Sequence, residues 1–471
     1  MLLYENLAHE FATLIDEGRI RPGDRLPSVR RLAQQRKLSI STVIQALRTL
    51  ESRGIVEARP QSGYYVRGRN ARILETPAIT AAPAPVDVGV SSRLLSVLRD
   101  NEKPGMVPFG SALPAPELLL SPRLSRLYSS IARKNPKLLA NGSCCSELSD
   151  APFVKAIVRR SVEWGYPIAP DELVATNSCT EAIMLCLRAV TKLGDTIAVE
   201  SPTYFVMLQL LETLGLRALE IPTHPKTGVS LEALELATRN GQVAACLFIS
   251  NGANPLGAVI PDETKQAIAD LLALRSVPLI EDDIYGDICF TNERPRPIHA
   301  FDKSGNTMLC TSFSKTVSPA LRVGFVATGR RSAQIVLQKT LMSGKTNSLT
   351  QQVIAELLET RGFDVHLRTL RRRFGDQVAR TRDAIARYFP LETRVTDPLG
   401  GFVLWLELPQ DIDATALHRK AVAVGISFVP GEMFSASGQY RNYIRLACGH
   451  PWNEQIDDAL KRLGGLCVCT N

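Results

Sequence analysis

A helical pattern of apolar residues opens the chain. Between residues 2 and 17, apolar side chains recur at helical spacing, namely at Leu3, Leu7, Phe11, Leu14 and Ile15. Gly18 and the turn residues 21–24 end this predicted helix. Ser28 and Ser39 stand where N-caps belong, so we expect a second helix after Ser28 and a third between Ser39 and Gly54.

After Gly54 the pattern changes from helical spacing to short β-type runs. Residues 55–58 and 64–66 predict two strands, joined by a loop that contains Gly63. Three helices followed by a hairpin is the element order of a winged helix. The inward stripe of the third helix is Val43, Leu47 and Leu50. This leaves polar side chains on its outer face that are able to contact base edges and phosphates, namely Ser41, Thr42, Gln45 and Arg48.

Residues 70–90 are rich in alanine and proline and have no periodicity, which is typical of a semi-rigid tether. Beyond about residue 100, apolar β-type runs alternate with amphipathic helical stretches. The predicted strands are 196–199, 218–221, 243–249, 277–280, 307–310 and 324–327, and the helices between them include 180–190, 262–274 and 334–342. This alternation indicates an α/β fold with a mostly parallel sheet, whose ligands bind beyond the carboxyl ends of the strands. We therefore expect a winged helix over residues 1–69, a linker over 70–100 and a large domain over 101–471.

Charge is concentrated in the predicted winged helix. Residues 1–70 hold twelve Lys/Arg and seven Asp/Glu, which gives +5 of the formal +8 of the whole chain. Charge alone favours a solvated surface, so only the helical pattern can favour a phosphate-binding face. No apolar run approaches the roughly 18 residues that a membrane span needs, and the N-terminus has no basic region typical of a signal peptide.

The ten cysteines form no C-x-x-C pair. Neither of the two close pairs has histidines of the metal-binding type nearby, so we predict no metal site. Reduced thiols in a cytoplasm are the expected state.

Four polar motifs lie where predicted strands end or helices begin. They are TNSCTEAI at 176–183, ISNGANPLG at 249–257, VPLIEDDIYGD at 277–287 and TSFSKTVSPALRVG at 311–324. The first places helix N–H groups where they suit an anion. In the fourth, Ser312, Ser314 and Arg322 are able to hold a phosphate beside the amine of Lys315. Taken singly, each motif is as typical of a turn, an acidic loop or a surface lysine.

In this order the four motifs resemble those of the fold-type I aminotransferases, which bind pyridoxal 5'-phosphate, over about residues 105–465. The resemblance implies that Lys315 forms a Schiff base with the cofactor, and that Asp282 keeps the pyridinium nitrogen protonated. Lys315, Asp282 and Tyr285 are thus the implied catalytic residues. Tyr285 and Asn254 would contact the ring hydroxyl, and Tyr204 would stack on the ring. The implied phosphate-binding residues are Ser178, Cys179, Thr180, Ser312, Ser314 and Arg322.

Two pieces near the C-terminus extend this resemblance. GGFVLWLEL places Gly400 and Gly401 before a strand, where the backbone is able to approach a ligand closely. NYIRLACGH places Arg445 where the family binds the α-carboxylate of its substrate. Without the resemblance, a lone arginine in a strand is typical of a structural ion pair.

The first 67 residues closely resemble the GntR-type winged-helix domain through RPGDRLPSVRRLA, SISTVIQALRTLESRGIV and RPQSGYYV. The resemblance implies three sets of DNA contacts. Those to the backbone at the start of the second helix are Arg25, Ser28 and Arg30. The second set consists of the polar residues of the third helix, which would be the recognition helix. The third set is the wing tip near the minor groove, formed by Gln61, Ser62 and Gly63.

Together the two parts look like the MocR subfamily of GntR-type regulators. This resemblance implies a homodimer that binds an operator with two half-sites and senses an amino compound or the cofactor with its large domain. The alternative is an active aminotransferase with an accessory DNA-binding domain, because the catalytic set is complete. Ser178 stands where relatives often have glycine, and Phe153-Val154 where they have Leu-Arg. These departures bear on turnover rather than on cofactor binding.

Overall fold

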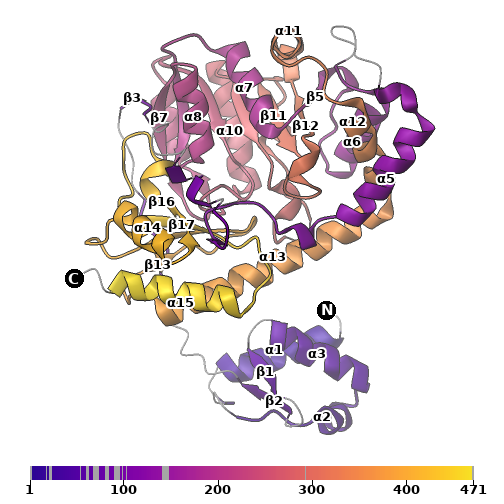
Figure 1. The fold of residues 1–471 in the computed structure, drawn as a ribbon, viewed down its shortest axis with the longest axis vertical. Coiled ribbons are helices and arrows are strands. Elements are labelled where there is room, and N and C mark those ends of the chain that lie inside the picture. The colour runs from indigo at the N-terminus through magenta and orange to yellow at the C-terminus, as the bar shows by residue number, and fades with distance from the viewer. Residues whose placement is uncertain are drawn as a thin grey trace. The chain divides into compact units, whose positions relative to one another are not determined.

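The protein is described by a computed structural model. It covers residues 3–16, 19–20, 24–52, 55–59, 63–66, 74–79, 84–89, 96–97, 99–101, 103–139, 148–291 and 293–468. The chain folds into two compact units (Figure 1). The first comprises Met1–Leu74 with the short segment Asp383–Arg387, and the second comprises Glu75–Arg382 and Tyr388–Asn471. Each unit has a hydrophobic core of its own.

The N-terminal unit is a three-helix fold with a hairpin. Its elements are α1 (Leu3–Asp16), α2 (Val29–Arg36), α3 (Ile40–Ser52), β1 (Val56–Arg59) and β2 (Gly63–Val66), and the two strands pair antiparallel. The inward stripe predicted for the third helix is fully buried against α1. Ser28 Oγ accepts the Arg31 N–H at 3.3 Å, and Ser39 Oγ accepts the Thr42 N–H at 3.1 Å. Both predicted N-caps are therefore confirmed.

The large unit is built on a mixed, mostly parallel sheet. Its strand order is β3-β7-β6-β9-β10-β11-β12-β5, with β8 paired to β7. The strands are β3 (Val86–Asp87), β5 (Leu173–Thr176), β6 (Thr196–Ser201), β7 (Arg217–His224), β8 (Gly228–Val229), β9 (Val243–Phe248), β10 (Leu279–Asp282), β11 (Thr307–Ser312) and β12 (Gly324–Ala327). From β7 through β11 neighbouring strands run parallel, whereas β12 is antiparallel to both its neighbours.

Helices cover both faces of this sheet (Figure 1). One face packs against α7 (Cys179–Val190), α8 (Phe205–Thr213) and α11 (Ser332–Met342). The other packs against α9 (Leu231–Thr238) and α10 (Asp262–Arg275) and, toward β5, against α5 (Ser121–Lys134), α6 (Ala151–Glu163) and α12 (Ser348–Leu358). The strands are apolar on both faces, which is expected of a sheet covered on both sides.

A second, antiparallel sheet follows in the C-terminal part of the large unit. Its order is β13-β14-β17-β16, formed by β13 (Arg394–Val395), β14 (Val403–Glu407), β17 (Tyr443–Ala447) and β16 (Val429–Pro430). A short parallel pair joins β4 (Val107–Pro108) to β15 (Ile426–Ser427). The accompanying helices are α13 (Arg361–Tyr388), α14 (Ala414–Ala423) and α15 (Glu454–Val468).

The predicted fold class is confirmed, and the structure differs from the predicted elements at three places. The strand predicted from residue 277 begins at Leu279, because Pro278 has no N–H to donate to the ladder. The four-residue strand β5 had no counterpart among the predicted strands. Part of the predicted linker belongs to the large unit, since Val86 pairs with Ala218 on β7 and the Val395 N–H donates to the Glu75 carbonyl at 2.8 Å.

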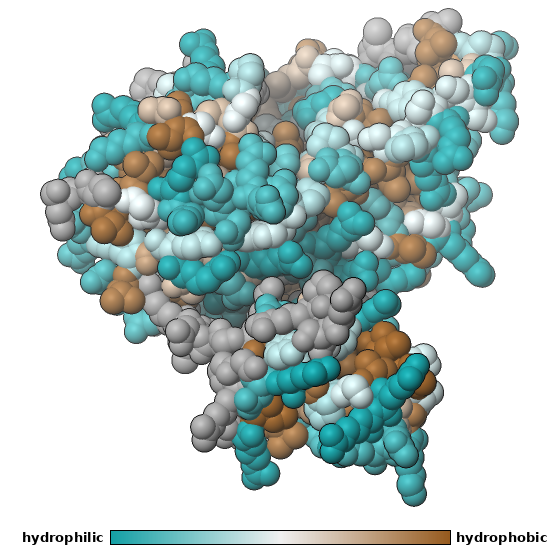
Figure 2. All heavy atoms as spheres, turned by 60° about the horizontal axis from the view of Figure 1, so that its bottom comes forward, coloured by the Kyte–Doolittle hydropathy of each residue, from teal (hydrophilic) through white to brown (hydrophobic). Residues whose placement is uncertain are grey.

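Hydrophilic side chains dominate the visible face of the large unit, with apolar side chains scattered between them (Figure 2). The apolar residues of the strands are inside, as the burial of β5, β6 and β10 shows. Among the described helices, none is both long and apolar enough to cross a membrane.

Replacement of Leu50 by alanine should lower the free energy of unfolding of the N-terminal unit by about 2–5 kcal/mol, because Leu50 is fully buried in its core. Calorimetry of the full chain should resolve two transitions, of which only one shifts. Arg48→Ala, on the exposed face of the same helix, is the control and should change stability by less than about 0.5 kcal/mol. An unchanged melting profile for Leu50→Ala would contradict the separate core.

Candidate functional site

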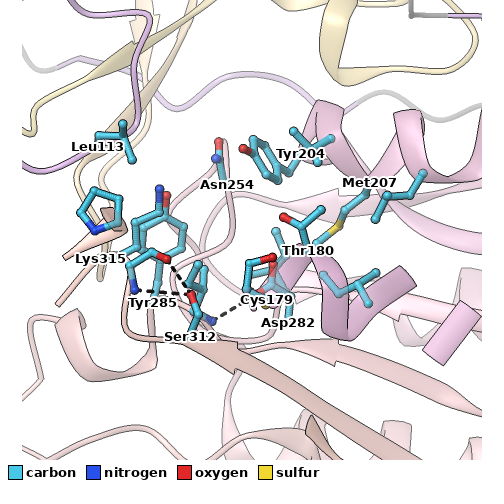
Figure 3. A pocket seen from close by; sticks show the side chains of 18 of the residues that line it. Leu113, Cys179, Thr180, Tyr204, Met207, Asn254, Asp282, Tyr285, Ser312 and Lys315 are labelled. Carbon is cyan, nitrogen blue, oxygen red and sulfur yellow. Dashed lines mark hydrogen bonds between the residues drawn. The ribbon is translucent and has the colours of Figure 1, made fainter. Parts of the chain in front are cut away.

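One cavity of the large unit gathers residues from all four motifs (Figure 3). They come from the N-terminus of α7, the start of α8, and the chain that follows β9, β10 and β11. The parallel strands bring their carboxyl ends to one edge of the sheet, so residues more than a hundred positions apart meet there. The predicted cofactor residues that line this cavity are Ser178, Cys179, Thr180, Tyr204, Asn254, Asp282, Tyr285, Ser312, Ser314, Lys315 and Arg322.

The N-terminus of α7 forms the first wall of the cavity. Ser178 is its N-cap and accepts the Glu181 N–H at 3.0 Å, while the Glu181 carboxylate accepts the Asn177 N–H. The pair resembles a capping box, except that the Glu181 carboxylate accepts from the residue before the N-cap. Lys339 is fully buried and its Nζ lies 3.0 Å from Glu181 Oε2, which ties α11 to the same turn. Glu181 and Lys339 were not predicted, although the S-x-x-E pattern at 178–181 signals the cap.

The chain after β11 forms the facing wall. Ser312 Oγ donates to Ser314 Oγ at 3.2 Å, and the Ser314 N–H donates to Ser312 Oγ at 3.4 Å. Arg322 is exposed and has a left-handed φ of 50°, which turns the chain back into β12. Hydroxyls, a guanidinium and the first N–H groups of α7 therefore surround one end of the cavity. This is a donor set for an anion such as phosphate.

Asp282 stands at the last position of β10 and is 4% exposed. Its Oδ1 accepts the Ile284 N–H at 3.0 Å and the Cys179 thiol at 3.2 Å. Burial raises the pKa of Asp282 to about 6, although both hydrogen bonds lower it. The carboxylate is thus held at the base of the cavity without an ion pair to any described cation.

Lys315 projects into the same cavity. Its Nζ donates to the Ala112 carbonyl at 2.6 Å. Burial lowers the pKa of Lys315 to about 8; the charge of Arg445 adds to this effect, and Asp282 opposes it. A larger share of neutral amine at neutral pH makes this lysine a stronger nucleophile than a surface lysine.

Tyr285 and Asn254 lie next to each other in the wall of the cavity (Figure 3). Tyr285 is almost fully buried, and burial raises its pKa, while a hydrogen bond with Asn254 lowers it. Asn254 Oδ1 is buried and has no hydrogen-bond partner among the described residues. Gly401 has a φ of 75°, and a Cβ on it would lie 3.6 Å from the Tyr285 ring, so it packs beside that ring rather than in the cavity wall.

Arg445 also lies outside the cavity wall, in the middle of β17. It is 1% exposed, and its guanidinium donates through Nη2 to the Gly110 carbonyl. Nε and Nη1 have no hydrogen-bond partner among the described residues, and no described carboxylate forms an ion pair with Arg445. Burial lowers the pKa of Arg445, and the nearby hydroxyls of Tyr285 and Tyr204 oppose this. The structural ion pair expected of a lone strand arginine is therefore not formed within the described chain.

The departure at Phe153-Val154 is a packing feature. Phe153 is fully buried and its ring lies 6.4 Å from that of Phe313, next to the Ser312–Ser314 turn. Residues 140–147, earlier in the stretch where this chain departs from the family pattern, lie outside the described residues.

In the N-terminal unit, most predicted DNA contacts form an exposed polar face. The exposed side chains are Arg25, Ser28, Arg30, Ser41, Gln45 and Arg48, and Thr42 is partly exposed. Gly63 has a φ of 111°, and a Cβ on it would lie 3.4 Å from Arg25 Nε, so the wing passes close over that guanidinium. Gln61 and Ser62 lie outside the described residues.

Comparison with known proteins supports both parts of this description. Residues 131–463 match the aminotransferase class I and II family, and residues 3–66 match the gntR family of bacterial regulatory proteins. Two Escherichia coli proteins named as uncharacterized HTH-type transcriptional regulators are 36% identical: YjiR, covering 98% of both chains, and YdcR, covering 99% of both.

Solved structures resemble the large unit. LysN, the α-aminoadipate aminotransferase of Thermus thermophilus, was solved with N-(5'-phosphopyridoxyl)-L-leucine; it is 28% identical and covers 79% of this chain and 94% of its own, with a TM-score of 0.73. A multiple substrate aminotransferase of Thermococcus profundus, 23% identical over 80% and 95% of the chains, has a TM-score of 0.74 and shares the fold. The chain belongs to the class I and II aminotransferase family and, through its N-terminal GntR domain, is a GntR-type transcriptional regulator of the MocR architecture.

Proposed function

We propose that this regulator binds pyridoxal 5'-phosphate covalently at Lys315 and uses it to sense an amino compound. The observation that carries the proposal is a pair of cations, half-buried Lys315 and buried Arg445, which lie close enough for the arginine to lower the pKa of the lysine. Neither forms an ion pair with a described carboxylate. Buried charges without a partner are costly and cluster at functional sites.

The residues of the cavity fit this cofactor. The anion-binding end formed by α7 and the Ser312–Ser314 turn suits its phosphate, and the unpartnered Asn254 Oδ1 and the Tyr285 hydroxyl suit its ring hydroxyl. Asp282 is placed to accept a ring N–H. When bound, pyridoxal phosphate supplies an aldehyde and an electron-withdrawing ring.

The chain's own groups have separable tasks. Lys315 supplies the amine that links the cofactor, and its lowered pKa keeps part of it neutral. Arg445 offers its unpartnered Nε and Nη1 groups to an α-carboxylate as charge-assisted donors. Tyr204, half-buried at the N-cap of α8, covers one side of the cavity. An amino acid would therefore be held at both its amino and its carboxyl end.

DNA binding completes the proposal. The exposed polar face of α2 and α3 is the surface we assign to DNA. By family resemblance we propose a homodimer whose two N-terminal units bind two operator half-sites. A ligand changes operator affinity only through its differential affinity for the arrangements of that dimer.

Catalytic transamination is the second candidate function. The 2-aminoadipate transaminase of Thermus thermophilus is 28% identical over 378 residues, and the implied catalytic residues Lys315, Asp282 and Tyr285 line one cavity here. Steady-state assays over a panel of amino acids and keto acids separate the two functions. Turnover near the 1–10³ s⁻¹ typical of enzymes would favour the catalytic role.

Covalent capture tests the cofactor assignment. Borohydride reduction with pyridoxal phosphate should place the pyridoxyl group on Lys315. An amine with a pKa of about 8 is about one quarter neutral at pH 7.5, against about a thousandth for the ordinary value of 10.5. The capture rate should therefore rise with pH, with a midpoint near 8. In Arg445→Gln the midpoint should lie higher, because a positive charge is removed. A reduced adduct on another lysine would refute the assignment.

Salt-dependent operator binding tests the DNA surface. Arg30→Ala and Arg48→Ala should weaken binding and make its dependence on salt shallower by about one unit of slope for each lost phosphate contact. Arg36→Ala is the matched control, because Arg36 pairs with Glu10 in the same unit and is not a predicted contact. Equal losses in all three variants would mean that net charge alone governs binding.

Effector coupling tests the sensor role. An amino compound that reacts at Lys315 should change operator affinity by a factor of several to about a hundred. Arg445→Gln should abolish the change while leaving covalent capture of the cofactor and basal DNA binding in place. Arg441→Gln is the control, since Arg441 is exposed and pairs with Asp413. If operator affinity stays constant with every compound that reacts at Lys315, the sensor role is wrong.

A further inference from the structure

A thiol contacts the carboxylate at the base of the cavity. Cys179 Sγ lies 3.2 Å from Asp282 Oδ1, and both side chains point into the cavity (Figure 3). Each residue is 4% exposed. The same oxygen accepts the Ile284 N–H at 3.0 Å. Oδ1 therefore holds two donors, and no described residue donates to Oδ2.

The position of Cys179 in α7 explains this contact. It is the first residue of the helix, so its N–H belongs to the anion-binding end, while its side chain turns toward the end of β10. Burial, and next the charge of Asp282, raise the pKa of the Cys179 thiol well above its usual value. The group therefore stays protonated and acts as a donor. The family resemblance implies only that Cys179 helps to bind phosphate at the start of α7, and this role does not explain the contact of its side chain with Asp282.

We propose that Cys179 is a positioning residue for Asp282: its thiol keeps this carboxylate ionised and leaves Oδ2 as the oxygen that accepts a ring N–H from a ligand. The part that concerns the ligand rests on the cofactor assignment proposed above. The part that concerns the carboxylate rests on the contact between Cys179 and Asp282 alone.

Opposing effects act on Asp282. Burial raises its pKa; the Ile284 N–H, the Cys179 thiol and the charge of Lys315 lower it, and Asp283 raises it. The groups on neighbouring elements that interact with this carboxylate are Lys315, Asp283, Glu200, Tyr204, Tyr285 and Cys310. Among the described residues, only Cys179 and Ile284 hydrogen-bond to it. Removal of the thiol therefore removes one of two direct donors, and the pKa of Asp282 must rise.

The first test uses the full chain without cofactor. The folded pKa of Asp282, about 6, lies above the unfolded value of about 3.9, so stability is lost as pH rises from about 4 to 6. A still higher folded pKa in Cys179→Ala extends this loss to higher pH. The stability difference between wild type and Cys179→Ala should therefore widen between about pH 5.5 and 7.5 in denaturant titrations.

Two variants separate this effect from packing. Cys186→Ala removes the same atom from a fully buried thiol on the same helix; its Sγ contacts Cys310 Sγ at 3.7 Å instead of Asp282. Its stability loss should not change with pH. Cys179→Ser keeps a donor and should restore the wild-type pH profile. A Cys179→Ala difference that is independent of pH, or a serine variant that behaves like alanine, overturns the proposal.

The second test measures the dissociation constant for pyridoxal phosphate against pH. Near pH 6.5, a pKa of Asp282 that is about one unit higher leaves about one quarter of the carboxylate ionised in Cys179→Ala, against about three quarters in wild type. Cys179→Ala should therefore bind roughly threefold more weakly at this pH, and the ratio should shrink toward pH 8.5. If wild type binds no pyridoxal phosphate while the stability profiles still separate, the cofactor assignment is wrong and the thiol–carboxylate contact stands. If wild type binds and Cys179→Ala follows it at every pH, the proposal for Cys179 is overturned.

Discussion

Removal of charged groups from water is the constraint on which this site depends. Asp282, Lys315 and Arg445 are all placed where burial shifts their pKa toward the neutral form. None of them forms an ion pair with another described residue. Direct pairing would relieve the cost of burial but would also neutralise the groups. The fold instead keeps them apart and holds each with neutral donors or acceptors, such as the Ile284 N–H and the Ala112 carbonyl.

A second layer of charges, fully paired, fixes the loop that carries this site. Asp283, next to Asp282, forms an ion pair with Arg294 and accepts the Asn251 side-chain N–H at 2.8 Å. The Arg294 guanidinium also pairs with Asp287 at 2.8 Å and lies 4.7 Å above the Trp164 ring. The contacts of Asp283 and Asp287 thus anchor the loop after β10, and this fixes the relative placement of Asp282 and Tyr285.

The sequence predicted what depends on local pattern. The spacing of Val43, Leu47 and Leu50 predicted a buried helix face, and motifs at strand ends predicted residues that the parallel sheet brings together. Features that depend on tertiary contacts were not predicted from the sequence. β5 was missed although β12, also four residues long, was predicted; what makes it a strand is its antiparallel pairing with β12, far along the chain. The side-chain contact of Cys179 with Asp282 joins residues 103 positions apart, and no local pattern encodes it.

The buried guanidinium of Arg445 has a consequence for the lifetime of the protein. A charge that is desolvated and only partly hydrogen-bonded makes the folded chain less stable than its packing alone would allow. A carboxylate ligand that binds there stabilises the folded state by mass action, in proportion to the logarithm of its concentration. Proteases act on the unfolded fraction, so degradation slows as this ligand accumulates. The amount of regulator in the cell would then rise with the supply of the compound, independently of any change in operator affinity.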